Sequence, residues 1–227
     1  MKRLLALVML AGAVCAVAAV PASATNECRG LKVCVPVAGP WVLASPGQVE
    51  FQLACPKRFV VGGLDAELSS RGIEIGFLGN LGSPVNPGIT TSESAVFLGR
   101  LVRGQDVAAS FRPHIGCIPA SGGGQRSPTA YHVFAPGKPS VRHVTQIVVR
   151  PGRTQHYVGR CARNERLAAA SHAIGFLGDK PPAVSLARSV QVVQAVRAGR
   201  VSLTIRATRA LAGGRAVVQL DLVCAAR

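Results

Sequence analysis

Cysteines are the residues of this chain whose chemistry can be predicted most directly. Cys15 lies in an apolar amino-terminal stretch, and six follow it: Cys28, Cys34, Cys55, Cys117, Cys161 and Cys224. An even number of cysteines in an exported chain indicates disulfide bonds. The chain has no C-x-x-C pair, the pattern that would indicate zinc binding or redox chemistry instead. We predict the pairs Cys28–Cys34, Cys55–Cys117 and Cys161–Cys224, all with a structural role.

Arginines are the second group of residues that could have a chemical role, and they are unevenly distributed along the chain. Residues 25–120 hold 8 basic and 7 acidic side chains, whereas residues 121–227 hold 16 basic and 3 acidic ones. Such a field attracts polyanions by long-range steering. The candidate anion-binding residues are Arg150, Arg153, Arg160, Arg163, Arg166, Arg206 and Arg209. The alternative is a solvated basic face that only keeps the protein soluble.

The partners expected for such a face are an anionic cell-wall polymer, an acidic polysaccharide or lipid headgroups. Nucleic acid is disfavoured as the dedicated partner, because stacking on bases requires aromatic side chains. The aromatic residues that could stack on bases are Trp41, Tyr131 and Tyr157.

A catalytic constellation is not evident in the sequence. The G-x-S-x-G and H-E-x-x-H patterns are missing, and the five histidines are dispersed without metal-ligand spacing. We therefore predict no catalytic residue, no metal and no cofactor. The alternative is an envelope hydrolase that uses Asp65 and Glu67, which share one face of a strand, in a cleft between two units.

The first 24 residues have the features of a secretory signal peptide. Lys2 and Arg3 precede an uncharged apolar stretch over residues 4–20, and Pro21 and Ala-Ser-Ala follow it. We predict cleavage after Ala24, export from the cytoplasm, and no transmembrane segment in the mature chain.

Alternating apolar residues predict the elements that position these groups. Val49, Phe51, Leu53 and Cys55 share one face of an extended strand. The same alternation leads to Cys117 and to Cys224, so each cysteine should point toward a core. With 25 Gly and 15 Pro, the chain favours short strands joined by turns. We predict an all-β protein of antiparallel sandwiches.

Repeated landmarks indicate an internal duplication. A Pro-Gly turn, an alternating run and a cysteine occur twice, and the tetrapeptide GFLG follows each time at residues 76–79 and 175–178. The closing cysteines lie 62 and 63 positions after Cys55 and Cys161. We predict two tandem units, each closed by a disulfide: residues 25–118, a Gly/Pro/Ser-rich linker over residues 119–140, and a strongly basic unit over residues 141–227.

The first unit resembles modules found in uncharacterised secreted proteins of high-GC bacteria. Cys55-Pro56, then Val60-Val61-Gly62-Gly63, and a later strand that ends in cysteine carry the likeness. The resemblance implies a small β-sandwich and brings no functional residues. The second unit departs from it, with Ala162 in place of the proline. Taken together, the sequence predicts a secreted, non-enzymatic binding or structural module at the cell envelope.

Overall fold

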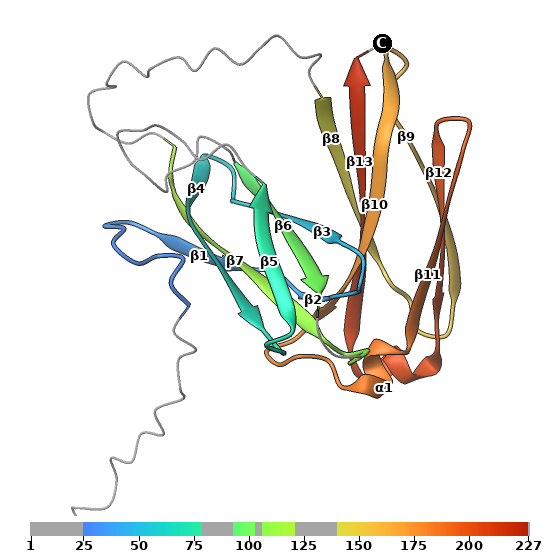
Figure 1. Cartoon of the computed structure of the whole chain (residues 1–227), viewed down its shortest axis with the longest axis horizontal. Helices are drawn as coiled ribbons and strands as arrows, with labels where there is room; N and C mark the ends of the chain where they lie inside the picture. Colours follow the sequence, from blue (N-terminus) through green and yellow to red (C-terminus); the bar gives the residue numbers. More distant parts are fainter. Residues whose placement is uncertain (1–24, 79–92, 103–105, 121–139, 227) are drawn as a thin grey trace, which may run out of the picture.

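The computed structural model describes residues 25–78, 93–102, 106–120 and 140–226, and in these residues the chain is almost entirely antiparallel β-structure (Figure 1). The predicted all-β class is therefore confirmed. The predicted signal peptide and most of the predicted linker lie outside the described residues.

Strands β1 to β7 form the first unit. They are β1 (Val35–Ala38), β2 (Trp41–Leu43), β3 (Val49–Ala54), β4 (Phe59–Leu68), β5 (Ile73–Leu78), β6 (Ser94–Leu101) and β7 (Ser110–Pro119). One sheet has the order β3-β6-β5, and in the other β7 pairs with β4 on one side and with β1 and β2 on the other. Phe51, Phe97 and Phe111 are fully buried in its core, as the alternation in β3 predicts.

Strands β8 to β13 form the second unit. They are β8 (Ser140–Val148), β9 (Thr154–Arg160), β10 (Glu165–Leu177), β11 (Val190–Arg197), β12 (Arg200–Ala207) and β13 (Arg215–Ala226), with the short helix α1 (Val184–Ala187) and the 3-10 turn η1 (Arg209–Gly213). One sheet has the order β11-β12-β9, and the other β10-β13-β8. The inward side chains Leu203, Ile205 and Leu220 are completely or almost completely buried.

All three predicted disulfides are confirmed: Cys28–Cys34, Cys55–Cys117 and Cys161–Cys224. The two long ones occupy matching positions. Each joins the residue that follows the first strand of a three-stranded sheet, β3 or β9, to the last strand of its unit, β7 or β13. Cys117 and Cys224 are fully buried, so each bridge lies between the sheets that it joins.

The two units also share a backbone register. Val61 lies opposite Cys117 and Leu167 lies opposite Cys224, and each of these strands has an irregularity immediately afterwards, between Val61 and Gly63 or between Leu167 and Ala169. A duplication would produce this parallel. Antiparallel sandwiches can also reach one strand order independently, so the tandem duplication stays a prediction.

The two GFLG tetrapeptides do not correspond to each other, and their use as landmarks is wrong. Phe77 lies on β5 in the three-stranded sheet and is 44% exposed. Phe176 lies at the end of β10 in the other sheet and is 2% exposed, opposite Trp41. Identity of four residues did not require an equivalent environment, because each stretch meets a different neighbouring strand.

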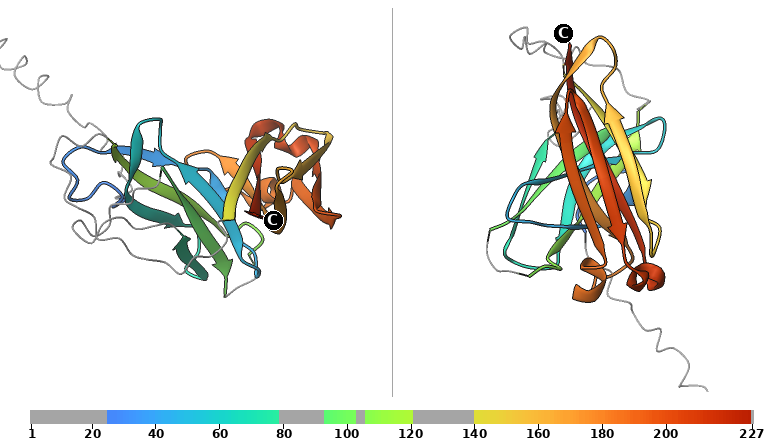
Figure 2. Two further views of the ribbon diagram at one scale, coloured as in Figure 1. Left: turned by 90° about the horizontal axis from the view of Figure 1, so that it is seen from above. Right: turned by 90° about the vertical axis from the view of Figure 1, so that its right-hand side faces the viewer.

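The units are joined by a shared sheet. β2 pairs with β10, which links β4-β7-β2 of the first unit to β10-β13-β8 of the second, and the units lie side by side in Figure 1 and in the left view of Figure 2. The buried Gln219 side chain accepts a hydrogen bond from the Gln52 amide and donates one to the Gln52 carbonyl. Arg142 pairs with Glu50 of the first unit and with the buried Asp221.

Candidate anion-binding site

The arginines predicted to bind anions fall into two groups at opposite ends of the sheet β11-β12-β9. Arg160, Arg163 and Arg166 lie at the end of β9, in the following turn and at the start of β10. The other group lies where β9 begins and β12 ends: Arg150, Arg153, Arg206 and Arg209. At about 3.3 Å per residue, the length of β9 separates the groups by about 20 Å. One small ligand therefore cannot contact both.

Three arginines lie directly opposite one another on neighbouring strands. Arg200 of β12 pairs in register with Arg160 of β9 and with Arg197 of β11. Side chains in such positions leave the same face of the sheet, with Cβ atoms about 4.5–5.5 Å apart. All three are exposed. We call Arg160, Arg197 and Arg200 the arginine row.

The local sequence fixes two members of this row, Arg197 and Arg200. The β11–β12 turn consists of Ala198 and Gly199, both with positive φ, 48° and 73°. Two such residues make the tight hairpin turn that matches the twist of the strands, and this turn forces Arg197 and Arg200 into opposite positions. Val201 points into the core, so the alternation along β12 places Arg200 on the outer face.

The arginine row has no acidic partner among the described residues. None of the ion pairs found there includes any of its three members. Like charges directly opposite one another destabilise a sheet. The row therefore costs the folded protein free energy that no ion pair found among the described residues offsets.

Two hollows adjoin the row. A cavity of about 620 Å³, here named the arginine cavity, lies between the β9–β10 and β11–β12 turns. Its charged lining residues are Arg160, Arg163, Arg166, Arg200 and Glu165. A second hollow of about 450 Å³ is lined by Arg197, Arg200, Val158, Ala198 and Ser202. Arg200 lines both hollows and is the centre of the site.

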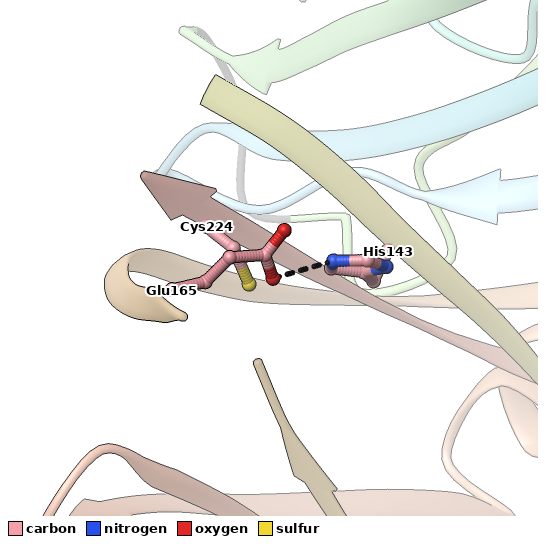
Figure 3. A group of neighbouring side chains, drawn as sticks. All are labelled: His143, Glu165 and Cys224. Carbon is pink, nitrogen blue, oxygen red and sulfur yellow. Dashed lines mark hydrogen bonds and ion pairs between the residues drawn. The ribbon is translucent and has the colours of Figure 1, made fainter. Parts of the chain in front are cut away.

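Glu165 is the one carboxylate that lines the arginine cavity, and it has partners of its own. It accepts a hydrogen bond from the Ala162 amide at 3.0 Å, and its carboxylate lies 3.0 Å from His143 Nε2 (Figure 3). The bond from Ala162, followed by the contact with His143, lowers the pKa of Glu165. Glu165 therefore stays anionic and holds the turn that carries Arg163.

His143, Glu165 and Cys224 bring potential metal-ligand atoms within 4.8 Å of one another (Figure 3). The sulfur of Cys224, however, is bonded to Cys161. Metals bind cysteine as the thiolate. With the bridge intact, the group offers one imidazole and one carboxylate, fewer than the three or four protein ligands of zinc sites.

The structure places Asp65 and Glu67 on β4 and not between the units. β4 is the edge strand of the large sheet, and β7 and β2 separate it from β10. The hydrolase hypothesis, which placed these two carboxylates in a cleft between the units, is therefore wrong about their location. A pocket of about 490 Å³ between the units contains His172 among its lining residues but no carboxylate.

A partly buried acidic cluster surrounds His114 instead. His114 Nε2 lies 3.6 Å from Glu67, and its Nδ1 lies 3.8 Å from Glu27. Asp65 accepts a hydrogen bond from the Asn26 amide at 2.6 Å. Burial is the main reason that the pKa of His114 is lowered, and the neighbouring carboxylates oppose this effect. Glu27 and His114 are only 5% and 6% exposed, so the segment near the amino terminus covers this group.

Arg197 and Arg200 were not predicted as site residues, although they are among the 16 basic side chains of residues 121–227. Their spacing around Ala198-Gly199 was an available signal, because a two-residue hairpin places its flanking residues opposite each other. No comparable pattern indicated that Glu27 and His114 lie in one cluster, because they are far apart in the sequence.

No protein-family model, no curated protein and no solved structure matches this chain. Within the described part of the chain, no helix has the length and apolar character required to cross a bilayer.

Proposed function

We propose that this protein is an exported, non-enzymatic binding module of the cell envelope, and that its second unit binds an anionic polymer or surface. The three disulfides indicate an oxidising, extracytoplasmic environment. The predicted signal peptide is consistent with this location.

The arginine row is the observation that carries the proposal. Its three guanidinium groups share one face, adjoin two hollows and lack an ion-pair partner among the described residues. A basic face needed only for solubility could distribute its charges apart from one another. Placing them in direct opposition lowers stability, and an anionic ligand would offset that cost.

Cell-wall polymers, acidic polysaccharides and lipid headgroups share the required charge. Nucleic acid fits less well, because Trp41 is 4% exposed and Tyr157 is partly buried against the core. Neither ring is available for stacking on a base, and Tyr131 lies outside the described residues.

The hydrolase alternative receives less support from the geometry. Glycoside hydrolysis requires carboxylates that a sugar can reach. Asp65 contacts the chain segment that leads into the Cys28–Cys34 loop, and Glu67 is near a buried histidine. A substrate would have to displace this segment first.

The test is binding of the mature chain, residues 25–227, to long-chain polyphosphate and to a polyuronate. We expect binding at about 25 mM salt and at least tenfold weaker binding at about 500 mM, where ions screen charges beyond a few ångströms. Replacing the three arginines of the row by Gln should weaken binding by tenfold or more. The control is Arg100→Gln in the first unit, which should change the affinity less than twofold. Failure to bind either polymer at low salt contradicts the proposal.

A further inference from the structure

We propose that the arginine row, together with Arg163 and Arg166, recognises a tetrahedral oxyanion, the phosphate or sulfate ester group of the bound polymer. This inference rests on the proposed function and specifies its ligand chemistry. The site is the arginine cavity and the adjoining outer hollow, with Arg200 between them.

The number of donors distinguishes this ligand from a carboxylate. A guanidinium group carries five N–H donors in a planar fork, and one fork satisfies both oxygens of a carboxylate. The row presents three such forks from adjacent strands. A phosphate or sulfate ester has additional oxygens that point in other directions, so several forks can bind it simultaneously.

The backbone spacing permits this convergence. Neighbouring strands lie about 4.8 Å apart, and arginine side chains are long enough to bend toward one point above the central strand. Arg200 occupies that central strand, with Arg160 and Arg197 on either side. Arg163 in the β9–β10 turn and Arg166 at the start of β10 line the arginine cavity with Arg160 and Arg200. Four cations can thus surround an anion in the cavity, and Arg197 lines the adjoining hollow.

Glu165 acts as a positioning residue for this site. Its carboxylate holds the Ala162 amide and His143, which fixes the turn that carries Arg163. Four arginines line the cavity with this single carboxylate, so the site retains an excess of positive charge.

The outer face next to the row has room for the uncharged part of a polymer. Ala195, Ser202 and Val158 form the adjacent cross-strand row, and Val158 is 61% exposed. These small or apolar side chains lie about 6–7 Å from the arginine row, two residues along each strand. A sugar or polyol unit attached to the oxyanion can lie over them.

The test measures binding of inorganic phosphate, sulfate and acetate to the mature chain by calorimetry at constant ionic strength. We expect phosphate and sulfate to bind at least tenfold more tightly than acetate. Arg200→Gln should weaken phosphate binding at least tenfold. Arg215→Gln is the matched control, because Arg215 is an exposed arginine of the same unit, at the start of β13, and lines neither hollow, and it should change the affinity less than twofold.

A conservative variant separates charge from geometry. Arg200→Lys keeps the charge and loses the fork, so it should retain polymer binding and reduce the preference for phosphate over acetate. Polyphosphate binding without binding of inorganic phosphate or sulfate, or with equal effects of Arg200→Gln and Arg215→Gln, overturns the oxyanion site and leaves the proposed function intact. Binding of phosphate without binding of either polymer supports the site and contradicts the proposed function.

Discussion

The two units share a strand order and use their outer surfaces differently. In the first unit, the residues around Glu27 cover the large sheet, and their backbone lies against Gly63 and Gly116 of β4 and β7. In the second unit, the outer face of β11-β12-β9 is open and carries the arginine row. One sandwich plan therefore supports a covered acidic cluster in one unit and an exposed basic row in the other.

Glycine explains why the covering segment can lie on the first unit. A Cβ atom at Gly63 or Gly116 would collide with the Glu27 carbonyl oxygen. The strand irregularity in the second unit has Ala169 where the first unit has Gly63. The glycines of the Val-Val-Gly-Gly sequence thus have a local packing role, and the second unit has no matching requirement.

The largest expected effect concerns the two long disulfides. Replacing Cys55 and Cys117 together by Ala should lower the free energy of unfolding by about 4 kcal/mol, and replacing Cys161 and Cys224 should have the same effect, since loops of nearly equal length are closed. Denaturant unfolding measures both. Replacing Cys28 and Cys34, which close a much shorter loop, should cost about 2 kcal/mol. A difference of more than about 2 kcal/mol between the long pairs would show that the units depend unequally on their bridges.

The contact between the units should produce the next largest effect. Arg142→Ala leaves Glu50 and the buried Asp221 without their cation, and burial already raises the pKa of Asp221. We expect a loss of about 3 kcal/mol in the free energy of unfolding. The control Arg100→Ala breaks an ion pair whose side chains are 56% and 62% exposed, and it should cost less than about 0.5 kcal/mol. Equal losses would argue against a structural role for the shared contact.

The pH dependence of stability should distinguish the first unit. Burial lowers the pKa of His114, so the unfolded chain takes up its proton more readily. The neutral His114 ring makes its full contribution to the free energy of unfolding above about pH 6.5. This contribution is lost as the pH falls through the lowered pKa of the folded state. In urea titrations, His114→Gln should flatten this fall, by at most about 1.4 kcal/mol per pH unit. Carboxylates of Glu27, Glu67 and Asp65 and the cation of Arg112 face this ring, and an unchanged slope would contradict the role assigned to His114.

The smallest expected effect concerns the turn below the arginine row. Ala198 has a positive φ, which costs a residue with a Cβ atom about 1 kcal/mol, and Asn tolerates it better. Ala198→Asn should therefore stabilise the protein by less than about 1 kcal/mol in thermal or denaturant unfolding. Ala195→Asn, in an extended position of the same hairpin, should give no gain. A loss of stability in Ala198→Asn would contradict the assigned turn.

The alternation of apolar residues determined the strand class, the inward direction of Phe51 and the orientation of Cys55, Cys117 and Cys224. Those directions, with the spacing of the cysteines, were sufficient to predict the disulfides. Alternation did not predict that Gln219 and Asp221 on the opposite face of β13 are buried as well, because it does not say which other element covers a face.

By itself, the sequence determined the all-β class, the cysteine pairs and the concentration of arginines in the second half of the chain. Only the tertiary structure decided that Arg160 joins Arg197 and Arg200. Arg160 lies about forty residues before Arg200 in the chain, and pairing of β9 with β12 brings them together. The physical reason is that strand periodicity fixes the face on which a side chain lies, whereas hydrogen-bond register between distant strands fixes its neighbours.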